Sequence, residues 1–481
     1  MISLSHQTNT RVAATLSVAL PLILLSLLLS ACGAKQQTEE TTSKQSAKQE
    51  ALPARCEHEA CINHNVDAFE VDGIRVIVKH QESPPLAVAR IYFEGSTIDW
   101  TKANEGHHAL ALDVATDGGP ADLDRQSYHA QLEEVAASIS SSVSRDYSIA
   151  GLFSPSFALE GTFQLLAQSL LSPAFETNQI ENARAQQLAA IRTRFDDADS
   201  AVAEVTRALA WKDHPYALHA LGEEETIAQA SREDLQKALD QLLVRERMIV
   251  VFSGKVDNQT AKKLVQTHLK DVKSNPTWAK DNNYPDAIPR FEYTGGAVEI
   301  MERANIPTNY ILGYFAAPNA TDDNYAATVI AMRILRDRLF KEVRTKRNLS
   351  YAVSSALGDR RANTGALYVT ATNPKETLQV MYDTIDHMIE EGVTQEDIDN
   401  EVRTYLTRYY MDLQSFSSQG HQLAKWQILT GDRLNADRFI DALRAVTPEQ
   451  ISEALRSTLR NIQFGVVGNP EQIDVEQFRA R

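Results

Sequence analysis

Two residues in the second half of the chain have the chemistry to hold a peptide substrate. In the stretch LFKEVRTKRNLSYAV, Arg344 and Tyr351 stand seven residues apart. A guanidinium can bind a peptide carbonyl or a C-terminal carboxylate, and a phenol can donate a hydrogen bond to an oxyanion forming on a carbonyl under attack. Spacing alone favours a structural interpretation, with Arg344 on the polar side of a helix and Tyr351 as an aromatic residue of a strand. That helix would bury Leu335, Leu339 and Val343.

The histidines of the first half do not have the spacing of a metal site. His107 and His108, in GHHALALDVATDGG, are adjacent, so on a helix their side chains diverge by about 100°. The positions four residues after them hold aliphatic side chains. We therefore expect both histidines at the surface or at a helix start. His214 in DHPY and His219 are expected in a loop and at a helix edge, because no carboxylate or thiol stands beside them at metal-ligand spacing.

The N-terminus has the features of an export signal over residues 1–31. A short polar stretch with Arg11 precedes an almost wholly apolar run, and small residues follow it. A transmembrane anchor is the alternative, but the basic start, apolar middle and small-residue cleavage site favour a signal that is removed.

The sequence Leu-Ser-Ala-Cys at residues 29–32 resembles the bacterial lipoprotein pattern. This resemblance implies that Cys32 receives the lipid and becomes the mature N-terminus. Gly33, rather than Asp, follows it, which implies the outer membrane of a Gram-negative cell and a periplasmic location. Residues 32–55 are expected to form a flexible tether, because they carry almost no apolar side chains.

Charge and cysteine content narrow the function classes. The formal charge is −16, and loss of the segment before Cys32, whose only formal charge is Arg11, leaves −17. Such acidity disfavours binding to nucleic acid or anionic lipid, so contact with the membrane is expected through the lipid alone. Cys56 and Cys61 form a close pair that favours a disulfide in an exported protein. The alternative is a small metal site that would use a nearby histidine.

The rest of the chain is too long for one ordinary domain, and it contains an internal repeat. Three landmarks recur in the same order at nearly one offset: TNQIENAR from Thr177 and TQEDIDNEVR from Thr394, SREDL from Ser231 and TPEQI from Thr447, and the apolar runs before Gly254 and Gly468. We therefore predict a tandem duplication, with one domain over residues 56–270, a proline-containing linker over residues 271–291 and a second domain over residues 292–481.

Each unit mixes the periods of strands and helices. Strands are predicted over Phe69–His80 and Leu86–Glu94, and a half-buried strand over the alternating residues 137–144. Helices are predicted over Ala158–Leu171, Thr177–Arg194 and Ser231–Leu243, the last with a capping box of Ser231 and Asp234. The lack of strict alternation predicts an α+β sandwich in each unit.

The order of several motifs resembles the pitrilysin/insulinase family of zinc metallopeptidases, also called inverzincins. The motifs are GIRVIVKH, YFEGSTIDW, a helix led by Gly106, SVSRDY, LLSPAF, DHPY and LFKEVRTKRNLSYAV. The resemblance covers nearly everything from Phe69 onward. It implies two tandem α+β domains that form one half of a clamshell, whose two halves enclose a chamber where unfolded peptides are cut.

The zinc site that this resemblance implies is degenerate. The family carries HxxEH on the first long helix, where two His four residues apart share one zinc and the Glu activates water. Counted from Gly106, Ala109 and Asp113 stand where the histidines belong, and Leu112 stands where the catalytic Glu belongs. Ala189 and Ala190 occupy the expected positions of the third ligand, a Glu. We expect no metal and no catalytic group in this chain, since Asp113 alone cannot hold a catalytic zinc.

Arg344 and Tyr351 match an Arg and a Tyr that in active relatives reach the substrate beside the zinc. The chain thus resembles the noncatalytic subunit of two-chain members. This implies a heterodimer with a zinc-bearing paralogous subunit, in which Arg344 and Tyr351 complete the partner's site and unfolded peptide binds along a sheet edge. The alternatives are a catalytically silent peptide-binding or scaffold lipoprotein, and a free-standing peptidase with an unfamiliar metal site.

Overall fold

The computed structural model describes residues 61–481, so the predicted signal peptide, the tether, Cys32 and Cys56 lie outside the described residues. The first half of the chain carries strands β1 (Val66–Val71), β2 (Ile74–His80), β3 (Leu86–Glu94), β4 (Ser138–Val143), β5 (Tyr147–Pro155) and β6 (Met248–Gly254). Its helices are α1 (His107–Gly118), α2 (Arg125–Glu134), α3 (Leu159–Leu171), α4 (Thr177–Arg192), α5 (Ala198–Ala210), α6 (Glu224–Gln229), α7 (Arg232–Leu242) and α8 (Asn258–His268).

A connecting segment with the short helix α9 (Trp278–Asp281) leads to the second half. The strands there are β7 (Ala297–Glu302), β8 (Asn309–Ala316), β9 (Val353–Leu357), β10 (Thr364–Ala371) and β11 (Gln463–Gly468). The helices are α10 (Tyr325–Leu339), α11 (Pro374–Glu390), α12 (Gln395–Asp412), α13 (Phe416–Thr430), α14 (Asn435–Arg444), α15 (Pro448–Thr458) and α16 (Val475–Arg479), and a π-helical turn, Phe340–Thr345, follows α10.

The two sheets repeat one topology. The first has the order β1-β2-β6-β3-β5-β4 and the second the order β7-β11-β8-β10-β9. In each sheet the last strand in sequence pairs parallel to an early strand, β6 to β2 and β11 to β7, and the remaining pairs are antiparallel. The predicted α+β fold with two tandem related units is confirmed, and the repeated landmarks lie at equivalent places, on α4 and α12, α7 and α15, and β6 and β11.

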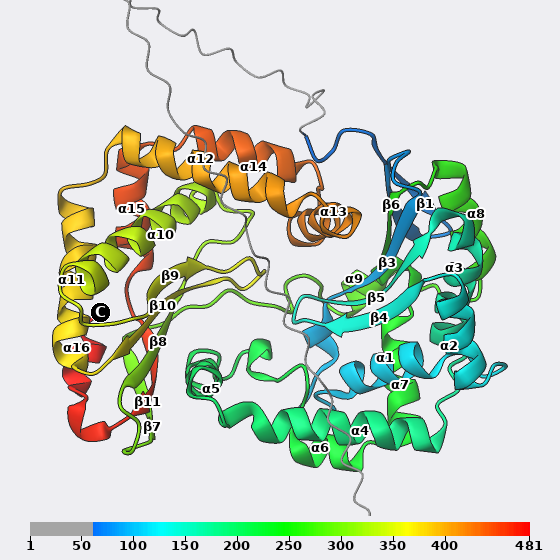
Figure 1. Cartoon of the computed structure of the whole chain (residues 1–481), viewed down its shortest axis with the longest axis horizontal. Helices are drawn as coiled ribbons and strands as arrows, with labels where there is room; N and C mark the ends of the chain where they lie inside the picture. Colours follow the sequence, from blue (N-terminus) through cyan, green and yellow to red (C-terminus); the bar gives the residue numbers. More distant parts are fainter. Residues whose placement is uncertain (1–60) are drawn as a thin grey trace, which may run out of the picture. The chain divides into compact units, whose positions relative to one another are not determined.

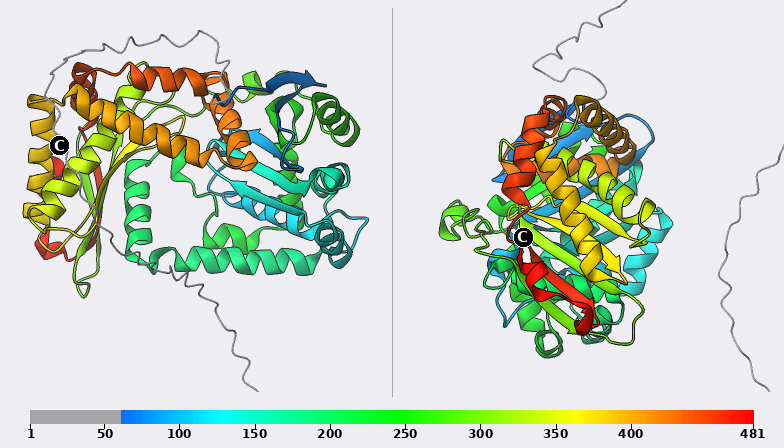
Figure 2. Two further views of the ribbon diagram at one scale, coloured as in Figure 1. Left: turned by 45° about the horizontal axis from the view of Figure 1, so that its top comes forward. Right: turned by 90° about the vertical axis from the view of Figure 1, so that its left-hand side faces the viewer.

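Each sheet is covered on one face by helices of its own half. Apolar residues of α1, α3, α7 and α8 form one core with the first sheet, and those of α10, α11 and α15 form another with the second. Figures 1 and 2 show these helix layers outside the two sheets. Leu335, Leu339 and Val343 are fully buried in the second core, as their spacing predicts.

The other face of each sheet is covered by a helix from the opposite half. Helix α13 packs on β2, β3 and β6, while α5 packs on β7, β8 and β11. Polar contacts fix both helices: Ser253 donates to the Phe416 carbonyl at 2.8 Å, and Thr206 on α5 donates to the Leu312 carbonyl at 3.2 Å. Gly465 allows the second contact, because a Cβ there would lie 2.3 Å from the Thr206 hydroxyl.

The predicted strand over Phe69–His80 is wrong in one respect, because the structure divides it into the hairpin of β1 and β2. Val71 pairs with Ile74, which leaves Asp72 and Gly73 as a two-residue turn. Both have positive φ, 51° and 86°, as a type I′ turn requires. The Asp-Gly pair was the signal for this turn, and the sequence interpretation passed over it.

Other predicted elements agree with the structure. Strand β3 spans Leu86–Glu94 as predicted, and the alternating residues 137–144 form β4 with Ile139 and Val143 partly buried. Helix α7 begins with the predicted capping box, in which Ser231 and Asp234 exchange hydrogen bonds. In the described range, residues 61–481, none of the helices combines the length and the apolar character that a membrane crossing needs.

The first described residues connect the first sheet to α14 through hydrogen bonds. The backbone amides of Ile62 and Asn63 donate to the Asp437 carboxylate at 3.1 and 3.3 Å, and the Lys79 ammonium donates to the Ile62 carbonyl at 2.9 Å. Cys61, which immediately precedes Ile62, is disulfide-bonded. Its predicted pairing with Cys56 stays a prediction, since Cys56 lies outside the described residues.

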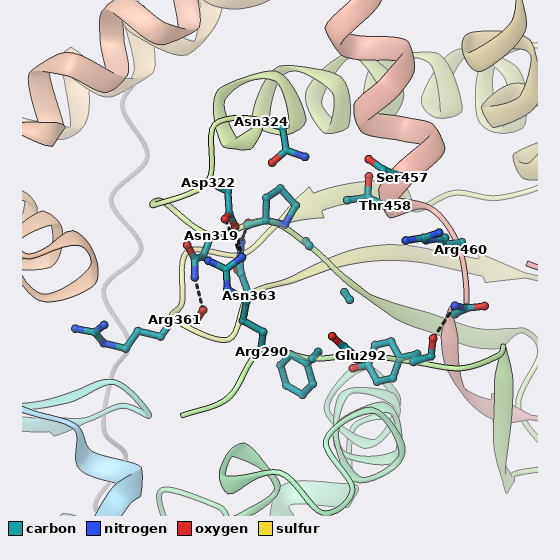
Figure 3. A pocket seen from close by; sticks show the side chains of 16 residues that line it. Arg290, Glu292, Asn319, Asp322, Asn324, Arg361, Asn363, Ser457, Thr458 and Arg460 are labelled. Carbon is teal, nitrogen blue, oxygen red and sulfur yellow. Dashed lines mark hydrogen bonds and ion pairs between the residues drawn. The ribbon is translucent and has the colours of Figure 1, made fainter. Parts of the chain in front are cut away.

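A polar pocket of about 620 Å³ lies beside the second sheet, lined by the chain after α9, the turn before α10 and the end of α15 (Figure 3). None of the residues predicted from the sequence to act in a site lines it.

Substitution of Gly465 by Ala is expected to lower the free energy of unfolding by about 1–3 kcal/mol, because the new methyl overpacks the contact between α5 and the second sheet. Gly161→Ala is the control: nothing lies within 4 Å of a Cβ there, and Gly161 is inside α3, so Ala should be neutral or stabilise by up to about 1 kcal/mol. Urea unfolding measures both. Equal stability of the two variants would contradict the described packing of α5 on the second sheet.

Candidate functional site

The start of α1 is held by a close crossing of two chain segments. Gly106, with φ 85°, precedes the helix, and a Cβ on it would lie 2.5 Å from the Leu221 carbonyl oxygen. Gly222, with φ 74°, faces it, and a Cβ there would lie 2.3 Å from the Glu105 carbonyl oxygen. Gln187 on α4 donates to the carbonyls of Gly106 and Leu221 at 3.2 and 2.7 Å. Helices α1 and α4, which would carry the zinc ligands, are therefore firmly placed.

The residues of α1 that replace the expected ligands have different surroundings. Leu112, at the position of the catalytic Glu, is fully buried in the core of the first half. Ala109 is half-buried and Asp113 is exposed. The surrounding protein excludes part of the water from the Asp113 carboxyl, which raises its pKa. The negative charge of Asp117, one turn further along α1, raises it again. One aliphatic side chain, one methyl and one carboxylate cannot perform the chemistry of HxxEH.

Helix α4 packs on α1 and presents Ala189 and Ala190 on its exposed side. Their methyl groups have no atoms that bind a metal. Across residues 61–481, no group of three or more His, Cys, Asp and Glu side chains is arranged to hold a metal ion. This arrangement fits a zinc site poorly, and no chemical step is derived through a metal in this chain.

The edge of the first sheet runs beside α1. Strand β4 is the last strand of the sheet, and Thr116 on α1 donates to the hydroxyl of its Ser141 at 3.3 Å. A pocket of about 310 Å³ lies between α1, α2 and β4, with Asp113 and Asp117 in its lining. Since β4 pairs with β5 on one side only, its other side offers backbone groups to which an extended peptide can add.

His107 and His108 stand at the start of α1, which is one of the two predicted locations, but neither is at the surface. His107 is 6 % exposed and His108 is 2 % exposed. Trp100 donates from its indole nitrogen to Nδ1 of His108 at 3.0 Å. Burial, and then the positive charge of Arg247, lower the pKa of His108 to about 3, so its imidazole is neutral. One neighbour of His108, Trp100, is close in sequence, and another, Arg247, is distant.

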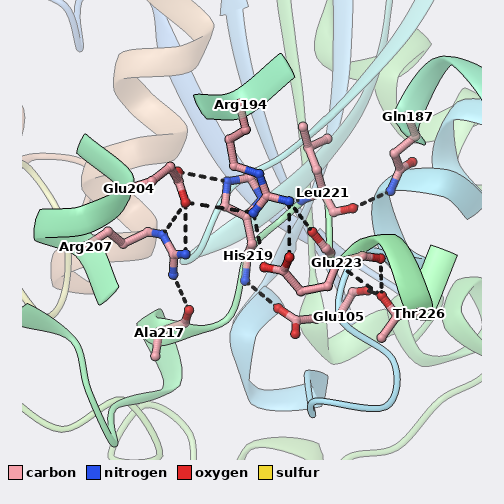
Figure 4. Close-up of polar contacts among 11 residues, drawn as sticks. Glu105, Gln187, Arg194, Glu204, Arg207, Ala217, His219, Leu221, Glu223 and Thr226 are labelled. Carbon is pink, nitrogen blue, oxygen red and sulfur yellow. Dashed lines mark hydrogen bonds and ion pairs between the residues drawn. The ribbon is translucent and has the colours of Figure 1, made fainter. Parts of the chain in front are cut away.

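A partly buried ion cluster that sequence reasoning missed supports the same region (Figure 4). Glu204 on α5 contacts Arg207 at 2.9 Å, His219 at 3.4 Å and Arg194 at 3.8 Å. The backbone amide of His219 donates to the Glu105 carboxylate at 2.8 Å, next to the start of α1. Burial raises the pKa of Glu204, but His219 and Arg207 outweigh it, and the pKa falls to about 2.

These contacts revise the prediction for the two remaining histidines. His219 has carboxylates beside it in space, although none stands beside it in sequence. His214 lies in a loop, as predicted, and its ring contacts the Pro289 carbonyl at 2.8 Å and the Tyr216 amide at 3.0 Å. The Glu204 and Arg207 pair at helical spacing was visible in the sequence, but the contact of Glu204 with His219 was not.

Arg344 and Tyr351 are brought together by the turn after α10. The Arg344 guanidinium carbon lies 4.3 Å from the centre of the Tyr351 ring and 4.8 Å from that of Phe340. Tyr351 is 80 % exposed and Phe340 is 44 % exposed, so the stack of these three side chains faces solvent. Tyr351 lies in the turn before β9 rather than in a strand, which corrects the structural interpretation.

The backbone around this pair is fixed. The Leu349 amide donates to the Val343 carbonyl at 2.9 Å, which holds the loop after the π-helical turn against it, and Val343 is fully buried. Ser350, buried beside Tyr351, donates to the Ala352 carbonyl at 2.8 Å. The buried neighbours therefore hold Tyr351 outward.

The Arg344 guanidinium is free to bind a ligand. Among residues 61–481 it makes no hydrogen bond or ion pair, and its contacts are with the two rings. The nearest carboxylate in sequence, Glu342, is occupied by Lys346 and Arg347, each at 2.7 Å. A half-buried cation stacked on an exposed phenol is suited to hold a carbonyl or carboxylate oxygen.

Glu204→Gln is expected to lower the free energy of unfolding at pH 7 by about 3 kcal/mol, the value of a pKa held near 2 instead of 4.5. Because the folded-state pKa is depressed, this contribution is complete above pH 4.5 and is lost as the pH falls toward 2. The difference between wild type and variant in urea unfolding should shrink over that range. The control is Glu453→Gln, an exposed partner of Arg456, which should cost under about 1 kcal/mol. A difference independent of pH would contradict the assignment.

Restoration of two ligands tests the alignment of α1. Ala109→His with Asp113→His places two imidazoles four residues apart, and the double variant should gain zinc that the wild type does not hold. Ala189→Glu and Ala190→Glu are then added one at a time. The variant whose new carboxylate faces α1 should bind zinc more tightly. Metal content by mass spectrometry and the cobalt absorption spectrum measure the gain. Absence of zinc from every combination would contradict the placement of the three positions.

Comparison with known proteins agrees with this geometry. Residues 229–405 match the family model described as the peptidase M16 inactive domain. The chain is 25% identical over 306 residues to an uncharacterized zinc protease of Mycobacterium bovis, a match that covers 61% of this chain and 68% of the relative. It is 22% identical over 425 residues to the non-peptidase homolog YmxG of Helicobacter pylori, covering 84% of this chain and 94% of the relative.

Solved structures share the fold. The peptidase M16 inactive domain from Pseudomonas fluorescens superposes with a TM-score of 0.75 at 19% identity, covering 84% of this chain and 98% of that one. The periplasmic protease PqqL of Escherichia coli has a TM-score of 0.71 at 17% identity, covering 88% of this chain but 49% of that one. The chain is therefore similar to the M16 peptidases in sequence and shares their fold, and residues 229–405 match the inactive domain of that family.

Proposed function

We propose that this chain is the noncatalytic, substrate-binding subunit of a heterodimeric periplasmic zinc metallopeptidase that degrades unfolded peptides. The observation that carries the proposal is the Arg344 and Tyr351 pair, which is assembled, exposed and without another partner among the described residues. The same chain has no ligand set on α1 and α4, so a pair suited to substrate stands without a site of its own.

The lack of a ligand set on α1 and α4 supports a partner of related fold. This chain shares the fold of PqqL, a periplasmic protease of Escherichia coli. A second subunit with an intact zinc site would supply the metal ligands that α1 and α4 of this chain lack. Zinc is then expected in the partner, and the M16 inactive domain of this chain would face it across the chamber.

The chemistry of the pair suits a role in trans. The Tyr351 hydroxyl can donate to the oxyanion that forms when zinc-bound water attacks the scissile carbonyl in the partner. The Arg344 guanidinium can hold a neighbouring carbonyl or the C-terminal carboxylate of the substrate. An unfolded peptide that adds to a sheet edge such as β4 is held through its backbone, so broad specificity follows.

The location follows from the sequence signals. Lipidation of Cys32 would anchor the mature chain to the outer membrane through lipid alone, with the folded part in the periplasm. The disulfide at Cys61 fits that oxidising compartment.

The second candidate is a catalytically silent peptide-binding or scaffold lipoprotein of the same fold. The similarity to the non-peptidase homolog YmxG favours it, because that relative matches over most of both chains. The two candidates differ in one respect: only the first requires a zinc-bearing partner whose turnover depends on this chain.

Replacement of Arg344 by Ala and Tyr351 by Phe tests the role in trans. Turnover of a quenched peptide by the assembled pair should fall by about 100-fold or more, because a donor to the oxyanion is lost, while the two chains stay associated. Arg347→Ala is the control, an exposed cation three residues further along that is paired with Glu342. Full activity of the double variant in an intact complex would overturn the proposed role.

A further inference from the structure

The polar pocket beside the second sheet is built before any ligand enters it (Figure 3). Its walls are loops fixed by amide side chains. Asn319 donates to the Arg361 carbonyl at 2.7 Å, Asn363 donates to the Pro318 carbonyl at 2.7 Å, and Asn461 donates to the Tyr293 carbonyl at 2.6 Å. At about 620 Å³ the pocket has the size of a small-molecule site.

Five charged side chains line the pocket, and three of them are already engaged. Arg290 pairs with Asp322 at 2.7 Å, which cancels both charges. Arg361 lies 4.8 Å above the ring of Tyr284 and donates to the Ile428 carbonyl, and in Figure 3 its guanidinium points away from the pocket.

Two charges of opposite sign remain. Neither the Arg460 guanidinium nor the Glu292 carboxylate has a hydrogen-bond or ion-pair partner within the described range, 61–481, and both residues are exposed. Figure 3 shows them on different sides of the pocket. The side chain of Asn324 is likewise without a partner in that range, and the Tyr293 hydroxyl is buried without a hydrogen bond.

A free cation, a free anion and neutral hydrogen-bonding groups around one cavity match a ligand that carries both charges. A simple anion suits the site less well, because Glu292 lines the pocket and the whole chain carries a formal charge of −16. A short peptide with free ends is neutral overall and presents a carboxylate, an ammonium and amides.

We propose that this pocket binds short peptides through both termini, with the C-terminal carboxylate on Arg460 and the N-terminal ammonium on Glu292. Asn324 and the Tyr293 hydroxyl then bind the peptide amides between them. The site is separate from Arg344 and Tyr351, which do not line the pocket, and its ligands have the chemistry of the products of peptide degradation. The inference does not require the chain to be part of a peptidase.

Isothermal titration of the full chain with trialanine, N-acetyl-trialanine and trialanine amide tests the site. The parent peptide should bind, and loss of either terminal charge should weaken binding about tenfold, because a charged hydrogen bond is removed. Arg460→Gln should weaken binding of trialanine and make C-terminal amidation cost nothing further. Glu292→Gln should do the same for N-acetylation.

Arg456→Gln is the matched control, since Arg456 lies one turn earlier on α15, is paired with Glu453 at 3.0 Å and does not line the pocket. Its affinity for trialanine should equal that of the wild type. Equal binding of the three peptides, or unchanged affinity in both Arg460→Gln and Glu292→Gln, would overturn the proposal, as would no binding of trialanine at millimolar concentration. Loss of peptidase activity in the Arg344 and Tyr351 variant would leave these titrations unchanged.

Discussion

The exchange of α5 and α13 between the two halves is the interaction on which the rest of the structure depends. A sheet has two faces, and each half supplies enough helices to cover only one of them. The second face of each sheet is buried by a helix that belongs to the other half, so neither half has a complete set of apolar contacts alone. The duplicated units are thereby joined through two equivalent contacts.

Because the exchanged helices complete both cores, the fold is stable without the metal chemistry of the family. The positions that would bind zinc lie on the outer sides of α1 and α4, and Leu112, at the position of the catalytic Glu, is part of the core. The start of α1 is held instead by the crossing at Gly106 and Gly222 and by the ion cluster around Glu204. These contacts stabilise the helix whether or not it holds a ligand.

Much of the fold was within reach of the sequence, because local signals fix it. The capping box at Ser231, the strand Leu86–Glu94 and the core stripe at Leu335 each depend on neighbours within a few residues. The repeat of these signals also predicted the duplication. The hairpin at Asp72 and Gly73 had a local signal too, and an apolar run on both sides of it concealed the turn.

The parts that could not be predicted depend on contacts between distant segments. Nothing near His108 in sequence announces that Arg247 lies beside it, and nothing near Glu204 announces that His219 completes its cluster. The site shows the same division. The absence of HxxEH was legible in the residues, whereas the stacking of Arg344 on Tyr351 and Phe340 came from the π-helical turn.

The central claim, that this chain serves a zinc-bearing partner, is tested most directly by native mass spectrometry of the complex extracted gently from its own membranes. The account predicts a one-to-one complex with a different chain of similar size and one zinc ion. A zinc-free monomer or homodimer would contradict it and would place the protein among the scaffold members of its family.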